Sequence, residues 1–389
     1  MGLALRRRPL AACLALATGG VAFAAAPHVP VPAGAIVVTN CDDDGPGSLR
    51  AAVALASSGD TIDLTQLDCS TITLTTGAIG VAQDDLALIG PGATSLAIDG
   101  NGQSSLLRHS GAGTLRVDSL TLTHGYLAQY YGHGGCVFSQ ANIALYRNVV
   151  SNCVVTGGFA RGGGLFAVHD LTISASVVTG NLADGGTLDA SGGGFLVGGY
   201  LQLLDSTLSD NTSRTAPPPD GTFSVGGGAD TFGDVVISGS TISGNRAKNV
   251  AGIVFEAHGT PTAVMVDSTV SGNIPTDNGP FGGVYAGIPL SLYNSTIAFN
   301  GGIGLVSGYA MHLESTIVAD NGGPTLTHAL LHASPAIDAG NNVDGLVNDQ
   351  RGDGFSRTIG AGVDIGAFEW QGGIDDPIFT SGFERGCVR

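Results

Sequence analysis

The chain has few of the residues that long helices and nucleic-acid-binding surfaces require. Only one of its 389 residues is lysine, Lys248, and charged residues make up 12% of the total. Tryptophan occurs once and methionine three times. Low charge combined with 43% hydrophobic residues excludes an intrinsically disordered acidic chain. The formal net charge of −17 would repel phosphate backbones, so we expect no nucleic-acid partner.

Glycine, by contrast, is abundant, with 63 residues. Because glycine costs about 1 kcal/mol at each helical site, this content argues against a helix-rich protein. Glycine does not recur at every third position, which excludes a collagen-like chain. We therefore predict an all-β protein with glycine at its turns.

The first residues have the pattern of a secretory signal peptide. Arg6, Arg7 and Arg8 precede an apolar run from Leu10 to Phe23, and small residues suited to cleavage follow it. This pattern predicts a signal peptide over residues 1–26. No later apolar run reaches the roughly 18 residues of a membrane helix, so no transmembrane segment is expected in the mature chain. We expect an exported protein, extracellular or associated with an outer membrane.

Five cysteines follow the predicted signal peptide. An exported protein can keep disulfides, and pairing cysteines that are close in sequence predicts Cys41–Cys69 and Cys136–Cys153. Cys387 is then either free or intermolecular. No group of cysteine and histidine has zinc-site spacing, so no metal site is predicted from these residues.

A short motif recurs along the chain, as in LLDSTLSDN (203–211), ISGSTISGN (237–245) and MVDSTVSGN (265–273). Each copy alternates apolar and polar residues, as a half-buried strand does, and usually ends in Asn. A glycine block and a second apolar run follow in most units, so we expect two or three strands per unit. The copies are spaced by 28, 30, 34, 28, 27 and 20 residues when they are aligned at Asn148, Ser176, Ser206, Ser240, Ser268, Ser295 and Ser315.

A unit of this size cannot bury its own apolar face, but stacked units form a continuous core. A propeller blade needs about 40–45 residues, which is more than these spacings allow. We therefore predict a parallel β-helix of about ten coils. Stacked amide side chains are expected to bond coil to coil at the recurring turn, as a ladder of Asn181, Asn211, Asn245, Asn273 and Asn300.

The run Ser-Thr-Ile-Ser-Gly-Asn at 240–245, its copies and the Gly-Gly-Gly blocks resemble a known family. They are similar to the right-handed parallel β-helix of the pectate-lyase-like fold. More narrowly, they resemble the polymorphic outer-membrane-type repeats of exported bacterial proteins. The resemblance covers about residues 60–325 and implies a solenoid that needs a cap at each end.

The ends complete the expected organisation. Residues 45–56 form the one convincing helix, with Ser48 as its N-cap and Leu49, Val53 and Leu55 as its apolar face. Its Gly-Ser-Leu-Arg-Ala-Ala stretch resembles the N-terminal cap of many exported bacterial β-helix proteins. We predict a cap at 27–60, the β-helix at 61–325 and a closing segment at 326–370. The tail at 371–389 resembles an ending of secreted proteins from some Gram-negative bacteria, and is either a sorting signal or a frayed terminus.

The loops between turns are the expected binding surface, because loops of successive coils lie side by side. Arg214 and Lys248 share one offset from adjacent anchors and are expected to be neighbours. Asp84-Asp85 is interpreted as a turn. The candidate binding residues are Tyr130, Tyr131, His133, Arg161, Asp184, Asp189, Arg214 and Lys248.

Acidic side chains in successive coils leave a Ca²⁺ site open, although their spacing matches no known calcium loop and favours turn carboxylates. The two runs in question are Asp184, Asp189, Asp220 and Asp230, and Asp344, Asn348, Asp349 and Asp353. No other cofactor is predicted.

No complete catalytic set is present in the sequence. We therefore expect adhesion, or binding of a polysaccharide or a cell-surface component, without catalysis. The alternative is a polysaccharide lyase or glycoside hydrolase that acts on an acidic glycan.

Overall fold

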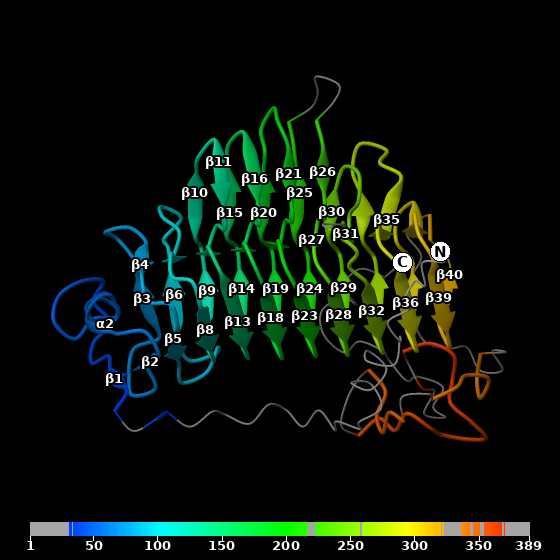
Figure 1. Cartoon of the computed structure of the whole chain (residues 1–389), viewed down its shortest axis with the longest axis horizontal. Coiled ribbons are helices and arrows are strands. Elements are labelled where there is room, and N and C mark those ends of the chain that lie inside the picture. Colours follow the sequence, from blue (N-terminus) through cyan, green and yellow to red (C-terminus); the bar gives the residue numbers. More distant parts are fainter. Residues whose placement is uncertain are drawn as a thin grey trace, which may run out of the picture.

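The chain winds into a parallel β-solenoid in the computed structural model, which confirms the predicted all-β parallel β-helix (Figure 1). The structure describes residues 31–32, 34–216, 222–256, 259–319, 321–322, 336–342, 345–350, 354–367 and 369. The predicted signal peptide, Cys387 and the tail at 371–389 lie outside these residues. Within them, α2 (Leu49–Leu55) is the only helix. No helix of the described part is long and apolar enough to cross a membrane.

Three parallel sheets, which we name A, B and C, run the length of the rod. Sheet A contains β1 (Ile36–Val37), β2 (Asp60–Asp63), β5 (Leu86–Ile89), β8 (Thr114–Asp118), β13 (Asn142–Tyr146), β18 (Leu171–Ser174), β23 (Leu201–Leu204), β28 (Val235–Ser238), β32 (Ala263–Val266), β36 (Leu290–Tyr293) and β39 (Met311–Glu314). Sheet B contains β3 (Thr71–Thr73), β6 (Ala97–Asp99), β9 (Thr121–Thr123), β14 (Val149–Ser151), β19 (Val177–Thr179), β24 (Thr207–Ser209), β29 (Thr241–Ser243), β33 (Thr269–Ser271), β37 (Thr296–Ala298) and β40 (Ile317–Ala319). Sheet C contains β4 (Ile79–Val81), β7 (Leu107–His109), β12 (Val137–Ser139), β17 (Leu165–Ala167), β22 (Phe195–Val197), β27 (Ala229–Thr231), β31 (Ile253–Phe255), β35 (Phe281–Ala286) and β38 (Ile303–Ser307).

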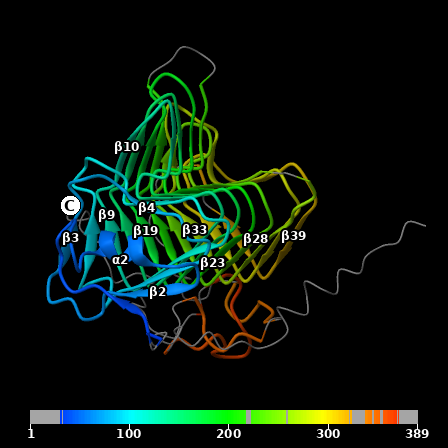
Figure 2. The ribbon, with the colours of Figure 1, turned by 60° about the vertical axis from the view of Figure 1, so that its left-hand side comes forward.

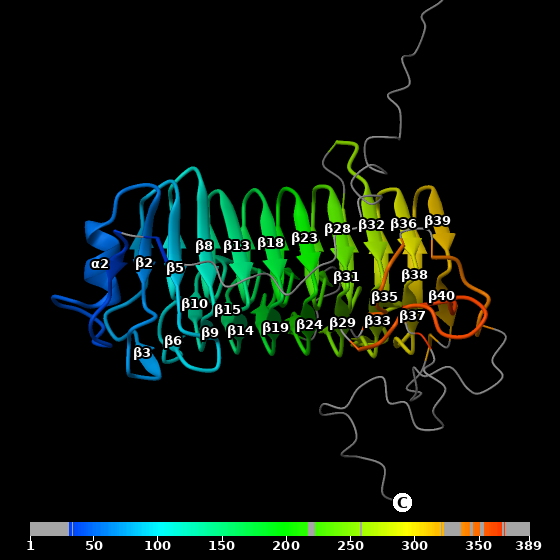
Figure 3. The same ribbon diagram turned by 90° about the horizontal axis from the view of Figure 1, so that it is seen from below.

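The core consists of rows of apolar side chains that run from coil to coil. Strand alternation sends every second residue inward, and the parallel register stacks equivalent residues directly on one another. In sheet A, for example, one buried row contains Leu145, Ile173, Leu203, Ile237 and Met265. Figure 3 shows the even spacing of the sheet A strands. This regularity is the structural counterpart of the sequence repeat.

Two further sheets form a projection between sheets B and C that we call the fin (Figures 1 and 2). Sheet D contains β10 (Tyr126–Ala128), β15 (Val154–Thr156), β20 (Leu182–Asp184), β25 (Thr212–Arg214), β30 (Arg246–Ala247) and β34 (Ile274–Pro275). Sheet E contains β11 (Tyr131–His133), β16 (Phe159–Arg161), β21 (Ala190–Ser191) and β26 (Ser224–Val225). The expectation of two or three strands per unit is therefore too low for the coils that carry the fin, which have up to five. Strands of two or three residues are too short to show an alternation in the sequence.

The fin has a small core of its own, separate from the core of the rod. Val155 and Ala183 of sheet D pack against Ala160 and Ala190 of sheet E, with Leu127 at the margin. Small side chains let the two sheets approach closely. Because neighbours alternate, the residues on either side of these positions point outward, those of sheet D to one face of the fin and those of sheet E to the other.

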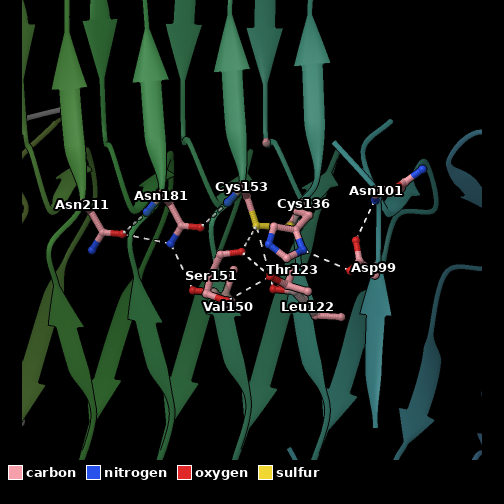
Figure 4. The surroundings of a disulfide bond; sticks show 12 residues. Asp99, Asn101, Leu122, Thr123, Cys136, Val150, Ser151, Cys153, Asn181 and Asn211 are labelled. Carbon is pink, nitrogen blue, oxygen red and sulfur yellow. Dashed lines mark hydrogen bonds and ion pairs between the residues drawn. A yellow bond between two sulfur atoms is a disulfide. The ribbon is translucent and has the colours of Figure 1, made fainter. Parts of the chain in front are cut away.

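The Asn side chains at the base of the fin form a buried ladder (Figure 4). The Nδ2 of Asn211 donates to Asn245 Oδ1 at 3.0 Å, and that oxygen also accepts the Asn211 backbone N–H at 3.0 Å. The same pair of bonds joins Asn181 to Asn211, Asn245 to Asn273, and Asn273 to Asn300. Each rung therefore satisfies buried backbone groups at a corner where the chain leaves the regular sheet.

Both predicted disulfides, Cys41–Cys69 and Cys136–Cys153, are confirmed. Cys153 occupies the ladder position next to Asn181, whose Oδ1 accepts the Cys153 N–H at 3.0 Å (Figure 4). In other coils the Asn side chain lies beside the third glycine of the Gly-Gly-Gly block, as Asn181 does beside Gly164. Cys136 takes the place of that glycine, so the disulfide replaces one Asn–Gly contact at the base of the fin.

The glycine blocks have two causes. Gly162, the first of its block, has a φ of +62°, which favours glycine. Gly163, the second, has no such φ, but a Cβ there would overlap the carbonyl oxygen of Gly193 in the next coil. The turns predicted from the sequence therefore explain only some of the glycines. Others are required because successive coils approach too closely for a Cβ atom.

Helix α2 covers the N-terminal end of the solenoid. The Ser48 side chain accepts the Ala51 N–H, as the predicted N-cap should, and Leu49, Ala52 and Val53 are buried. The prediction for Leu55 is wrong, since its side chain is 78% exposed. Ala52 takes its place on the buried face because the helix ends at Leu55 and the chain turns away.

The C-terminal part of the described chain lies against the last coils. The Gln350 side chain donates to Thr241 Oγ1 and accepts from Thr269 Oγ1, both on the outer face of sheet B. The sequence alignment of the last repeat is wrong by one residue, because the Ser295 N–H bonds to Thr316 Oγ1 rather than to Ser315. The spacing of that repeat is therefore longer by one residue.

Candidate functional site

The fin divides the predicted binding residues between its two faces. Tyr131, His133 and Arg161 belong to sheet E and flank its inward residues, so they share one outer face. Asp189 directly precedes the inward Ala190 and lies on the same face. This face meets the outer face of sheet C at an angle, and we call the resulting surface the groove. Asp184 and Arg214 belong to sheet D and lie on the opposite face.

Aromatic rings follow the groove across its first coils. The Tyr131 and Phe159 rings stack with centroids 5.2 Å apart and planes 7° apart, and Tyr130 meets both edge-on. The Tyr130 side chain is 60% exposed and that of Tyr131 is 62% exposed. We call these three rings, with His133, Phe138 and Phe166, the aromatic strip. Tyr130 and Tyr131 are the exposed rings of this strip, whereas Phe166 is buried. Exposed rings grouped in this way indicate a contact surface.

His133 is a neutral part of this strip. Its ring stacks on Phe166 with centroids 4.5 Å apart. Burial, Arg161 and Arg108 lower the pKa of His133. Arg108 lies over the Phe138 ring at 4.4 Å and donates to the His133 carbonyl oxygen at 2.6 Å. The first coils of the groove thus present flat rings bordered by a guanidinium that is already engaged.

The groove deepens into a cavity of about 190 Å³ beyond the aromatic strip. Charged and aromatic side chains line it from sheet C and from the fin. We call it the Asp230 pocket, and its lining includes Arg161, Asp189, Ser191, Phe223, Asp230, Phe232 and Glu256. Arg161 and Asp189 were candidates from the sequence, whereas Asp230 appeared there only as a calcium alternative and Glu256 was missed.

Asp230 is 2% exposed, and its Oδ1 receives no hydrogen bond from any residue that the structure describes. Burial, together with the nearby Glu256 carboxylate, raises the pKa of Asp230 to about 8. A hydrogen bond from Ser191 and the charge of Arg161 act in the opposite direction but are outweighed. Asp230 therefore holds a proton at neutral pH, although it faces a cavity.

Arg161 is exposed, and its guanidinium makes no hydrogen bond within the described part of the chain. The Asp189 Oδ1, by contrast, accepts the Phe223 N–H at 2.9 Å, which fixes this carboxylate at the cavity wall. The pocket thus combines one unengaged cation, an anchored carboxylate and a buried protonated carboxyl. Such a combination of convergent polar groups and aromatic walls is typical of small-molecule sites.

Arg214, on the opposite face of the fin, already has an acidic partner. Arg214 donates to Asp184 Oδ2 through Nε at 2.9 Å and Nη2 at 2.7 Å. Thr212 pairs with Arg246 of the next coil, and β30 ends one residue before Lys248, so the predicted neighbourhood of Arg214 and Lys248 stays a prediction. The Arg214 side chain is 58% exposed, so its ion pair contributes little to stability.

Two of the carboxylates considered for Ca²⁺, Asp189 and Asp230, line the Asp230 pocket. Asp184 and Asp189 lie on opposite faces of the fin, and Asp220, Asp344 and Asp353 are outside the described residues. Among the residues that the structure describes, no three His, Cys, Asp or Glu side chains gather as metal ligands. Asp84 and Asp85 accept backbone N–H groups from Ala112 and Thr114, as turn carboxylates do.

A second cavity, of about 440 Å³, lies where the fin begins and opens on its sheet D side. Its lining includes His124, whose Nδ1 lies 3.1 Å from Asp99 Oδ2. The cavity is open, and the His124 side chain is 53% exposed. We assign no chemistry to it.

A signal for Asp230 was present in the sequence. The blocks Gly-Gly-Gly-Leu-Phe-Ala (162–167), Gly-Gly-Gly-Phe-Leu-Val (192–197) and Gly-Gly-Gly-Ala-Asp-Thr (226–231) align without gaps. The structure stacks Phe166, Leu196 and Asp230 in one row. Asp230 follows three apolar members of this row, Phe138, Phe166 and Leu196, and this change of residue type marks the site. Glu256, which follows β31, shows no comparable departure.

Comparison with known proteins supports the fold alone. No family model matches the chain, and no curated protein is similar to it in sequence. Among solved structures, the crystal structure of pectate lyase Pel9A is similar, with a TM-score of 0.50 and 15% sequence identity. The match covers 87% of this chain and 97% of that chain. The chain therefore has a right-handed parallel β-helix fold similar to that of Pel9A, and its activity does not follow from this likeness.

Proposed function

We propose that the protein is an exported glycan-binding protein, and that a polysaccharide chain lies along the groove. The observation that carries this proposal is the aromatic strip, which leads directly into the Asp230 pocket. The apolar faces of sugar rings pack well on aromatic rings, and the pocket supplies hydrogen-bonding groups at one end of the strip. The disulfides and the fold are consistent with an extracellular location, either free or at an outer membrane.

The charge distribution argues for a neutral or cationic glycan. The net charge of −17 opposes the approach of an acidic polymer. Within the groove, Arg108 already donates to the His133 carbonyl oxygen, and burial together with Arg161 and Arg108 lowers the pKa of His133. The acidic glycan of the alternative, enzymatic function therefore has little electrostatic support in the groove.

Binding to soluble glycans of different charge tests this proposal. We expect purified protein to bind neutral or cationic oligosaccharides in isothermal titration calorimetry and to lose about tenfold in affinity on Tyr131→Ala, a change of about 1.4 kcal/mol. Tyr309→Ala is a matched control, because Tyr309 is 61% exposed but lies in the last coil, beyond the fin. Equal affinity of both variants for every glycan would refute the groove as the binding surface.

A polysaccharide lyase or hydrolase is the second candidate, and the similarity to the fold of pectate lyase Pel9A supports it. Incubation with pectin, alginate and neutral glycans, each with and without Ca²⁺, distinguishes the two functions. We expect binding without new unsaturated or reducing ends. Their appearance, with loss of the activity in Asp230→Asn, would replace the binding function by a catalytic one.

A further inference from the structure

We propose that the Asp230 pocket is a subsite for one uncharged sugar unit, and that the Asp230 carboxyl group hydrogen-bonds a hydroxyl group of that unit. This inference rests on the glycan binding proposed above and names the residue that selects the glycan. Two observations carry it: the place of Asp230 in the groove, and a buried carboxyl oxygen that no described residue satisfies.

Two rows of side chains bound the groove where it deepens. On the fin, the parallel register stacks Arg161, Ser191 and Val225. On sheet C, it stacks Leu196 and Asp230, one coil after the other. All five residues line the same cavity, so the pocket lies between the two rows. Because the three preceding members of the sheet C row are apolar, Asp230 is where this side of the groove becomes polar.

The Asp230 side chain is buried without a full set of hydrogen bonds. It is 2% exposed, and its Oδ1 receives no hydrogen bond from any residue that the structure describes. Buried polar atoms without a partner are rare in folded proteins, because each has lost its water without a replacement. Ser191, from the facing row, bonds to the same carboxyl group. A donor on a ligand in the cavity would complete the hydrogen bonding of Asp230.

A hydroxyl group is the chemical complement of Asp230 in the protonation state that the free protein holds. Burial, with a further contribution from Glu256, raises the pKa of Asp230 to about 8, so the carboxyl group is protonated at neutral pH. A protonated carboxyl group offers one O–H donor and one carbonyl acceptor, and a hydroxyl group also donates and accepts. An ammonium group has no acceptor and a carboxylate has no donor, so neither matches both oxygens of Asp230.

The rest of the lining fits a single sugar ring. The cavity of about 190 Å³ is smaller than the roughly 300–1,000 Å³ of sites for drug-sized ligands, so it holds about one unit of a glycan chain. Phe223 is 59% exposed at the cavity, and the apolar face of a sugar packs well on such a ring. Arg161 is exposed and makes no hydrogen bond within the described part of the chain, so it can donate to a second sugar oxygen.

The test measures the affinity of tetrasaccharides by calorimetry at pH 6.0, where Asp230 is protonated. The uncharged probes are β-1,4-linked tetramers of glucose, mannose and xylose, and the anionic probe is a tetramer of α-1,4-linked galacturonic acid. We expect at least one uncharged tetramer to bind about tenfold more tightly than the anionic one, because only an uncharged unit matches the protonated carboxyl group.

Substitutions at Asp230 separate its hydrogen bonds from its charge. Asp230→Asn keeps one donor and one acceptor in the same shape, so the best uncharged tetramer should keep its affinity to within about threefold. Asp230→Leu continues the apolar row of Leu196 and removes both groups, so we expect a loss of about tenfold, as for one hydrogen bond. Asp184→Leu makes the same change on the opposite face of the fin and should leave the affinity unchanged. Asp230→Val, which matches Val254 in the next coil, serves if Asp230→Leu does not fold.

Each outcome bears on a different statement. Unchanged affinity in Asp230→Leu would overturn the subsite, and so would equal losses in Asp230→Leu and Asp230→Asn, since the charged carboxylate would then be the group recognised. Tighter binding of the galacturonic acid tetramer than of every uncharged one would also overturn it and assign the pocket to an anionic sugar held by Arg161. Binding that depends on Tyr131 but not on Asp230 would leave the proposed function intact. Failure of every tetramer and of other neutral glycans to bind would refute the proposed function itself.

Discussion

The rod and the fin are built from the same coils but have different kinds of stability. In the rod, large apolar rows fill the interior, and the Asn ladder closes the corner between sheet B and the fin. In the fin, two sheets meet over Val155, Ala160, Ala183 and Ala190 and expose their remaining side chains. In the rod, each coil therefore pairs the buried polar groups of the next coil. In the fin, the exposed side chains differ from one coil to the next. Function is expected where the repeat is least strict, which is the fin and its junction with sheet C.

Among the substitutions compared at one pH, the largest expected loss of stability comes from the ladder. Asn245→Ala removes the acceptor for the Asn211 N–H and the donor to Leu208 O, all of them buried. Each buried group left without a partner costs about 1–3 kcal/mol, so we expect a loss of about 3 kcal/mol in the free energy of unfolding. Chemical denaturation followed by circular dichroism measures it. Thr207→Ala on the outer side of sheet B is the control, and an equal loss in both variants would argue against the ladder.

Disruption of the fin should leave the rod folded. Ala183→Asp places a carboxylate in the small core of the fin, which is expected to open locally rather than bury the charge. Hydrogen exchange should then lose protection in β15, β16, β20 and β21, while β18, β19 and β22 keep theirs. Loss of protection in all these strands at once would show that rod and fin form a single cooperative unit.

Tyr131→Ala should separate binding from stability. The ring is exposed and stacks on Phe159, so its removal should cost less than about 1 kcal/mol in the free energy of unfolding. The predicted tenfold loss of glycan affinity corresponds to about 1.4 kcal/mol of binding free energy, which exceeds this loss of stability. If stability falls more than affinity does, the aromatic strip serves mainly to pack the fin.

The last prediction is a dependence of stability on pH. Burial and Glu256 raise the pKa of Asp230 to about 8, above the value of an unfolded chain. The folded state therefore holds a proton that the unfolded state has lost, and this contribution to stability declines as pH rises from about 4 to about 8. The decline is at most about 1.4 kcal/mol per pH unit. Asp230→Asn should remove it, and identical slopes for both proteins in urea titrations between pH 5 and 8 would contradict this account.

The sequence predicted the rod well because the rod is where the repeat is strict. Asn211 and Asn245 end equivalent copies of one motif, so stacking the copies stacks the amides. The fin escaped prediction since strands such as Tyr131–His133 contain three residues, too few for a periodic signal. The turn between Asp184 and Asp189 decides which face of the fin each residue occupies, and the sequence does not show that turn. The pocket is formed by residues of four coils, which no single repeat reveals. The change from Phe166 and Leu196 to Asp230 was visible in the aligned glycine blocks, but the pocket around Asp230 follows only once the register is known.

The central claim is that the groove between the fin and sheet C is the functional surface. Hydrogen exchange measured with and without a neutral oligosaccharide tests it most directly. We predict slower exchange confined to β11, β16, β21, β22, β27 and the residues around Glu256, with sheet A and the sheet D face of the fin unchanged. Slower exchange on the sheet D face or at the ends of the rod, with none in the groove, would contradict the account.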